Sequence, residues 1–328
     1  MGATITTLSP DRLLKQMAEL WTQAGKQGQA EGGGVLRACT MTLVVAAEEE
    51  HGVSTLSETI AALMPEHPAR TIIVRLSRTA QQPAALVTAQ CWMPFGQRQE
   101  ICSEQVEITA PEGSFADVAS VIEPIAAPDL PLIVWCRSPR IFEREEFKHL
   151  AAMARKVVVD TTAVSDAKAA IQRVARMSAS GMILGDLSWT HLTRWRETIS
   201  QVFENSQYAA RLPEITRVQV NTSDPTMEAS AFYMGAWLTG ALESAGAKAE
   251  LTHDSRAKES SIELTGTGFR VQLIRQGNRL VTAIDQLSHC TSLPQPTECQ
   301  LVREELRIIR HDPIFERTLS AAARLSKP

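Results

Sequence analysis

Apolar and polar positions change their period repeatedly in the first half of the chain. The run 130–135 is apolar, rich in branched residues and too short for a helix, which is typical of a strand buried on both faces. Residues 147–154 then repeat apolar side chains with helical spacing, and 157–159 is a second branched run. A strand, a helix and a strand joined by a short crossover predict a βαβ unit with parallel strands.

The same alternation precedes this unit. Strands are predicted at 36–47 and 70–76, with an amphipathic helix at 54–64 between them. With the hairpin described next, these elements predict an α/β domain over residues 35–163. Its sheet is expected to be mainly parallel, with flanking helices and a β-hairpin.

Residues 84–109 read as two strands around a tight turn at 95–98, which is a β-hairpin signal. If the turn has two residues, counting back along both strands places Cys91 directly opposite Cys102. A disulfide, and with it redox control, is then geometrically conceivable. The alternative is that the two residues are small thiols on a buried face.

The end of this hairpin carries large or rigid apolar residues next to polar ones. Trp92, Met93, Pro94 and Phe95 stand beside Arg98, and aromatic residues, Met and Arg are enriched at protein interfaces. We predict that these five residues form a protein-contact patch. The alternative is that the patch folds back onto its own domain.

The two ends of the chain differ from the α/β region. Residues 1–34 are predicted to form an N-terminal helical arm and a flexible, Gly-rich linker, with a helical apolar stripe that ends at Trp21 and packs on this chain or on a partner. Residues 164–328 are predicted to form an α+β domain. Its later part contains short strands joined by Gly-bearing turns, which indicate an antiparallel meander. These strands are predicted at 248–253, 260–265, 269–275 and 279–285.

Two further groups of residues are candidates for partner binding. Trp135 and Arg137 lie at the end of the predicted strand 130–135, where they could stack on a ligand and bind an anion, or else be a core indole and a surface cation. Trp189, Arg194 and Trp195 lie on a predicted helix, where core packing of both indoles is the alternative.

Composition narrows the class of protein. The 328 residues are 21% charged and 44% hydrophobic, with a formal net charge of −4. This balance gives no reason to expect nucleic acid or a membrane surface as a partner. No apolar run is long enough to span a bilayer, and no signal peptide is visible. The six cysteines have no paired spacing and indicate reduced thiols in a cytoplasmic protein.

Motifs for catalysis are missing from the sequence. We find no dinucleotide or phosphate-binding glycine loop, no metal-ligand pattern of His and Cys, and no nucleophile elbow. Carboxylates are plentiful, but no pattern selects a pair for acid–base chemistry. The sequence therefore predicts a protein without catalytic residues, metal or cofactor.

Four stretches of the chain carry a distinctive combination of tryptophans and apolar runs. They are LSETIAALMPEHPARTIIVR, CWMPFGQRQEICSEQVEI, PDLPLIVWCRS and DLSWTHLTRWRETISQVFEN. Together they resemble the glucose-6-phosphate dehydrogenase assembly protein family, OpcA, and the resemblance extends from about Leu36 to the carboxyl end. It implies a chaperone-like, non-enzymatic partner that acts as an allosteric activator of the glucose-6-phosphate dehydrogenase oligomer in the pentose phosphate pathway.

A second hypothesis comes from the topology of a parallel sheet. Ligands bind beyond the carboxyl ends of such strands, which here brings in Arg137, Asp160 and Thr161. The alternative function is thus a sugar-phosphate-binding enzyme or sensor that uses this crevice.

Overall fold

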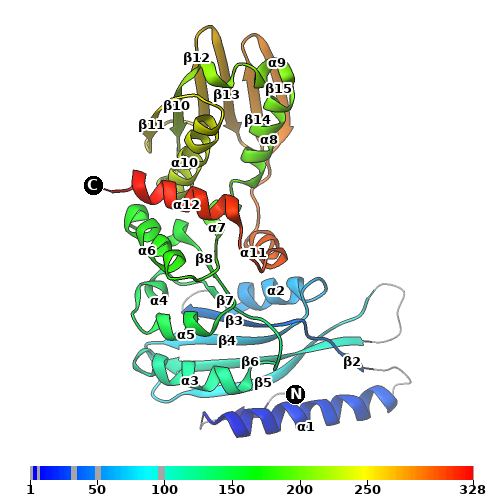
Figure 1. Ribbon diagram of the computed structural model, residues 1–328. Helices are drawn as coiled ribbons and strands as arrows, with labels where there is room; N and C mark the ends of the chain where they lie inside the picture. Colours follow the sequence, from blue (N-terminus) through cyan, green and yellow to red (C-terminus); the bar gives the residue numbers. More distant parts are fainter. Residues whose placement is uncertain (1–2, 6–7, 31–34, 49–52, 95–99, 328) are drawn as a thin grey trace. The chain divides into compact units, whose positions relative to one another are not determined.

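The chain was analysed as a computed structural model, which describes residues 3–5, 8–30, 35–48, 53–94 and 100–327 (Figure 1). It divides into two compact units. Unit 1 comprises Met1–Val159 and Val302–Ile309, and unit 2 comprises Asp160–Leu301 and Arg310–Pro328. Within the described ranges, no helix combines the length and the apolar character that a membrane span requires.

Unit 1 is built on one sheet. Its strands are β1 (Ala3–Ile5), β2 (Val35–Arg37), β3 (Met41–Glu48), β4 (Ala69–Ser77), β5 (Ala84–Trp92), β6 (Glu100–Pro111), β7 (Leu132–Cys136) and β8 (Lys156–Val159). They follow the order β1-β5-β6-β4-β3-β7-β8, and β2 also pairs with β6. All neighbours from β6 to β8 are parallel, whereas β5 is antiparallel to β6 and to β1. The predicted mainly parallel sheet with a β-hairpin is confirmed.

Helices cover both faces of this sheet. They include α1 (Pro10–Ala30), α2 (Val53–Leu63), α3 (Phe115–Ile125), α4 (Pro139–Glu143) and α5 (Phe147–Met153). The chain moves along the sheet in one direction from β3 to β4, and in the opposite direction from β6 to β7 and from β7 to β8. Right-handed crossovers therefore place α2 on one face and α3 and α5 on the other. Figure 1 shows α1 on the same side as α3. Every residue of β3, β4, β7 and β8 is consequently buried, as continuous branched runs predict.

Two predicted elements of unit 1 have different bounds in the structure. The predicted strand 36–47 is two strands, because β2 pairs with β6 while β3 pairs with β4 and β7. The first helix continues beyond Trp21, where the predicted apolar stripe ends, as far as Ala30. It packs on its own chain, with Leu13 and Met17 buried.

A short return of the chain completes unit 1. The second half of α11 (Glu298–Arg307) belongs to this unit. The buried ammonium of Lys156 donates to the Glu305 carboxylate at 2.6 Å and to the backbone oxygens of Glu305 and Ile308 at 2.8 and 2.7 Å. A buried cation needs such partners because its removal from water is costly.

Unit 2 contains a second sheet. Its strands are β10 (Ile215–Asn221), β11 (Glu250–Asp254), β12 (Ser261–Gly266), β13 (Phe269–Gln276), β14 (Arg279–Ile284) and β15 (Leu287–Ser292), in the order β11-β10-β12-β13-β14-β15. The predicted α+β fold with an antiparallel meander is confirmed. However, the predicted strand 248–253 lies outside the meander, because it is β11 and pairs in parallel with β10. The polar strand β15 extends the meander beyond β14.

Helices and one short strand complete unit 2. They are α6 (Ala167–Ala179), β9 (Leu184–Asp186), α7 (Leu187–Thr190), α8 (Thr193–Glu204), α9 (Ser206–Ala209), α10 (Glu228–Ser244) and α12 (Pro313–Leu325). The helix α12 begins where Asp312 accepts hydrogen bonds from the backbone N–H groups of Ile314 and Phe315, a regular N-cap.

Candidate functional site

The end of the β5–β6 hairpin presents apolar side chains to solvent. Met93 follows β5 and is 60% exposed, and its neighbours Trp92 and Pro94 are half-buried. Phe95 and Arg98, the other members of the predicted patch, lie outside the described residues. An exposed methionine next to an indole and a proline ring is the composition expected of a protein contact. We call Trp92, Met93 and Pro94 the hairpin patch.

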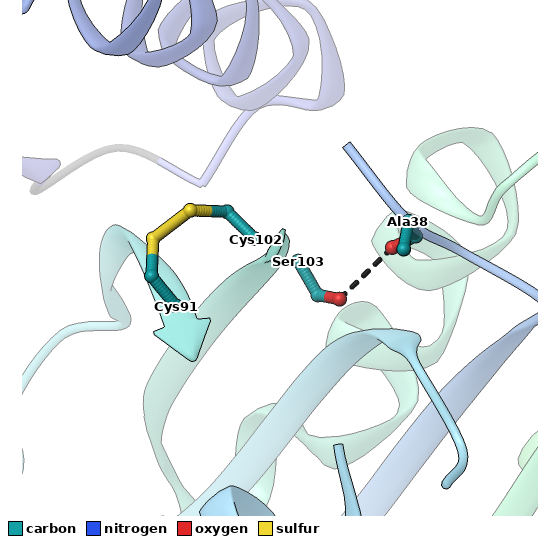
Figure 2. The surroundings of a disulfide bond; sticks show 4 residues. All are labelled: Ala38, Cys91, Cys102 and Ser103. Atoms are coloured by element: carbon teal, nitrogen blue, oxygen red, sulfur yellow. Dashed lines mark hydrogen bonds between the residues drawn. A yellow bond between two sulfur atoms is a disulfide. The ribbon is translucent and has the colours of Figure 1, made fainter. Parts of the chain in front are cut away.

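A disulfide ties the two strands together at the base of the hairpin patch. Cys91 pairs directly with Cys102, as the residue count along the hairpin predicts, and their sulfurs are bonded (Figure 2). The two Cα atoms are 4.1 Å apart. This differs from the expectation of six reduced thiols, because the strand register brings the pair within bonding distance. Beside it, the Ser103 hydroxyl donates to the Ala38 carbonyl at 2.9 Å, which holds β6 to the segment after β2.

Reduction of this disulfide is expected to lower the free energy of unfolding of unit 1 by about 3 kcal/mol, because the bond closes a loop with a sequence separation of 11 residues. Urea unfolding with and without dithiothreitol measures the difference. Cys91→Ser, at an exposed position, should match the reduced protein and lose its response to dithiothreitol. Cys290→Ser, at an exposed thiol of unit 2, is the matched control and should keep the response. Equal stability of the oxidised and reduced protein would contradict the expectation.

The hairpin base also gathers the one set of three close metal-ligating groups found in the described ranges. Donor atoms of Cys91, Glu100 and Cys102 lie within 4.8 Å of one another. Sulfur binds metals as thiolate, so the set becomes available only when the disulfide is reduced. Two thiolates and a carboxylate are ligands that suit Zn²⁺.

The tryptophans predicted at other contact surfaces are buried. Trp135 is fully buried in β7, and Trp195 of α8 is nearly so. Trp189 packs against the rings of Tyr233 and Phe315, with centroids 6.3 and 5.9 Å away. The prediction that these three indoles face a partner is therefore wrong, and the core-packing alternative holds. Segments that are distant in the sequence bury these side chains, and local spacing alone could assign them either to the core or to the surface.

The two arginines of the same predictions remain nearer to solvent. Arg137 is half-buried, and its backbone N–H donates to the Ala46 carbonyl at 2.9 Å, which fixes its position beyond β7. Arg194 has a 73% exposed side chain and pairs with Glu197 at 3.0 Å on the surface of α8. Such an exposed pair contributes little to stability.

The strand end proposed for the alternative function is occupied by internal hydrogen bonds. The Asp160 carboxylate accepts from the backbone N–H and the hydroxyl of Thr162 at 3.0 and 2.5 Å. Thr161 is buried, and its N–H and hydroxyl both donate to Asp186. These hydrogen bonds hold the start of unit 2 in place. Because the polar groups of Asp160 and Thr161 already have internal partners, they are less suited to bind a ligand in the predicted crevice.

Asp186, which the sequence analysis missed, is the centre of a buried polar network. Its carboxylate also accepts from the Ser188 N–H at 3.0 Å and from the Tyr233 hydroxyl at 2.8 Å. Burial, and then repulsion from Asp160, raises the pKa of Asp186 to about 6, and burial with the nearby Asp186 raises the pKa of Tyr233. Asp186 itself is fully buried within this network. Its network therefore serves the fold of unit 2.

The chain matches two models of one protein family. Residues 60–176 match the glucose-6-phosphate dehydrogenase subunit N-terminal domain, and residues 182–319 match the corresponding C-terminal domain.

Two curated cyanobacterial proteins match as well. The chain is 22% identical over 201 residues to the OxPP cycle protein OpcA of Nostoc punctiforme, a region that covers 59% of this chain and 43% of that protein. It is 23% identical over 194 residues to the protein of the same name from Synechocystis sp., covering 58% and 40%. The match thus spans less than half the length of these relatives.

A solved structure has a similar fold. A mutant of KijD10, a 3-ketoreductase from Actinomadura kijaniata in complex with TDP-benzene and NADP, has a TM-score of 0.50 and 12% sequence identity. The similarity covers 87% of this chain and 96% of the reductase. At this identity the likeness concerns the fold alone.

Proposed function

The chain belongs to the glucose-6-phosphate dehydrogenase subunit family, OpcA, and from this premise we propose that it is a non-enzymatic assembly factor and allosteric activator of that dehydrogenase. In this chaperone-like role it contacts the dehydrogenase oligomer as a protein, in the cytoplasm, and promotes the first step of the oxidative pentose phosphate pathway. In this proposal the chain binds the dehydrogenase and catalyses no reaction itself.

The observation that supports a contact mechanism best is the exposed hairpin patch. A 60% exposed Met93 at the end of a two-stranded hairpin is a large apolar side chain without cover. The Cys91–Cys102 disulfide joins the strands one residue before Trp92 and so limits their separation. A contact surface that is already ordered loses less conformational entropy when it binds.

Activation by binding has a thermodynamic condition. A partner shifts the population of the dehydrogenase toward its active oligomer only if it binds that arrangement more tightly than the others. A hundredfold difference in affinity corresponds to about 2.7 kcal/mol, which a small cluster of buried interface side chains is able to supply. We assign this role to the hairpin patch, with Arg194 and Arg137 as additional candidates.

Mixing the purified chain with glucose-6-phosphate dehydrogenase from the same cells tests the proposed function. We expect the mass of the dehydrogenase oligomer to increase, together with its activity, in proportion to the bound fraction. Mass measured by light scattering and activity measured on the same samples decide the result. If neither changes at concentrations up to 100 μM, the proposal is wrong.

Truncation of the hairpin patch tests the assigned surface. The double substitution Trp92→Ala and Met93→Ala is expected to weaken binding of the dehydrogenase at least tenfold, because it removes the apolar contact area. The matched control is Leu287→Ala, which truncates a 67% exposed apolar side chain of unit 2 and should leave the affinity unchanged. Circular dichroism of each variant monitors folding. Unchanged affinity of the double variant would remove the hairpin patch from the mechanism but leave the proposed function intact.

A further inference from the structure

Unit 2 contains a small, partly open cavity at one end of its sheet. The cavity has a volume of about 60 Å³ and lies where β10 ends, β12 begins and β13 ends, under α8 and α10. Trp195 and Met234 contribute apolar walls, and His191, Thr222 and Arg275 contribute polar groups. Apolar walls exclude water and so strengthen every electrostatic interaction inside the cavity.

One hydroxyl among the residues that line this cavity lacks a hydrogen-bond partner within the described structure. Thr222 is 7% exposed, and its Oγ1 has no partner among the residues that the structure describes. A buried hydroxyl left unsatisfied costs roughly 1–3 kcal/mol, which a hydrogen bond to a bound group would recover. Neighbouring polar side chains are already engaged: the Asn221 amide donates to Ser261, and the Ser230 hydroxyl donates to the Ser188 carbonyl, each at 3.0 Å.

The charge at the cavity favours an anion. Arg275 donates through Nε to the Gly277 carbonyl at 3.0 Å and through Nη2 to Gln295 at 2.6 Å. A guanidinium has five N–H groups, so these two bonds leave donors for a ligand. Burial lowers the pKa of His191, and Arg275 lowers it further against a weaker opposing effect of Asp160. The imidazole is therefore neutral at pH 7 and offers one N–H donor beside the cation.

A larger open pocket adjoins the cavity. It has a volume of about 710 Å³ and shares Ser260 and Arg275 with the cavity. Its remaining lining is polar and includes Lys258, Glu259 and Asn278. The cavity of about 60 Å³ has room for a compact oxyanion, and the open pocket has room for the rest of a larger ligand. Hydroxyl, amide and charged side chains outside the cavity suit a polyhydroxylated body.

We propose that this pair of cavities binds a phosphate monoester of a small polyhydroxylated molecule. The phosphate occupies the inner cavity between Arg275, His191 and Thr222, and the hydroxylated part lies in the open pocket. The site belongs to unit 2 alone and requires no dehydrogenase. It gives the chain a means to respond to a phosphorylated metabolite through a region separate in sequence from the hairpin patch.

The test uses the full chain by itself, so its result is independent of the proposed function. The probes are inorganic phosphate, glucose 6-phosphate, ribose 5-phosphate, glycerol 3-phosphate and unphosphorylated glucose. The readouts are the dissociation constant from calorimetry and the NMR titration of the His191 ring. We expect phosphate to bind and to raise the pKa of His191, because an anion favours the imidazolium. At least one ester should bind tenfold more tightly than phosphate, and glucose should not bind.

Variants locate the binding. Arg275→Gln is expected to weaken binding of phosphate and esters at least tenfold, and the nearly isosteric Thr222→Val about fivefold. Arg279→Gln, at an exposed arginine of β14 that lines neither cavity, is the matched control and should bind as the unchanged protein does. The inference is overturned if no anion shifts the His191 resonances, the result expected of a cavity that holds only water. It is also overturned if Arg275→Gln binds normally, or if no ester binds more tightly than phosphate.

Discussion

Replacement of Glu104 by alanine is expected to lower the free energy of unfolding of unit 1 by about 3–5 kcal/mol. Glu104 is 2% exposed, and its carboxylate accepts from Arg70 Nε at 2.7 Å, from Arg37 Nη2 at 2.5 Å and from Trp21 Nε1 at 2.6 Å. Without it, the buried guanidinium of Arg70 keeps the Ile125 carbonyl as its remaining partner in the described structure. The cost is the burial of an uncompensated cation.

Urea unfolding followed by tryptophan fluorescence measures this loss, and Trp21 reports directly on the contact between α1 and β6. The matched control is Glu19→Ala on α1, which breaks only the exposed Lys15–Glu19 pair at 4.0 Å and should cost less than about 0.5 kcal/mol. A loss below about 1 kcal/mol for Glu104→Ala would mean that Arg70 reaches water or another acceptor when the carboxylate is absent.

The second large effect is a pH dependence that Asp186 imposes on unit 2. The pKa of Asp186 is raised from 3.8 to about 6 in the folded chain, so the folded state binds this proton more tightly than the unfolded state does. Its contribution to stability is therefore fully present below about pH 4 and is lost as the pH rises to about 6 and above. A shift of roughly two pKa units corresponds to about 3 kcal/mol.

Asp186→Asn isolates this contribution, since the amide keeps the shape of the side chain and cannot ionise. We expect the stability of the variant relative to the unchanged protein to increase by about 3 kcal/mol between pH 4 and pH 8. The difference is the decisive quantity, because burial lowers the pKa of His191 and His253 and thereby adds a slope of opposite sign to both proteins. Asp224→Asn, at an exposed cap, should show no such change. Parallel pH profiles for Asp186→Asn and the unchanged protein would contradict the assignment.

Sequence reasoning succeeded where the signal is local. Continuous branched runs predicted β7 and β8, and counting residues from the hairpin turn predicted that Cys91 faces Cys102. It failed where a distant segment decides the outcome. The indole of Trp189 has the spacing of a helix surface or a helix core, and Phe315 of α12 determines that it is core.

The polar network of unit 2 could not be predicted from local sequence patterns for the same reason. Asp186 follows a short apolar stretch like many loop residues, and its partner Tyr233 lies 47 residues further along the chain. The patch at the hairpin end was only partly testable, because Phe95 and Arg98 lie outside the described residues. Its described members are the ones that carry the proposed contact.

The bond between Lys156 and Glu305 has a practical consequence for experiments on separate pieces of the protein. A fragment that stops at Val159 keeps strands β1 to β8 but loses Val302–Ile309, and with them the acceptors of a buried ammonium group. Such a truncated polypeptide should be poorly soluble, with a cation stranded in an apolar interior. Fusing Val302–Ile309 back onto the fragment through a designed linker should restore its solubility.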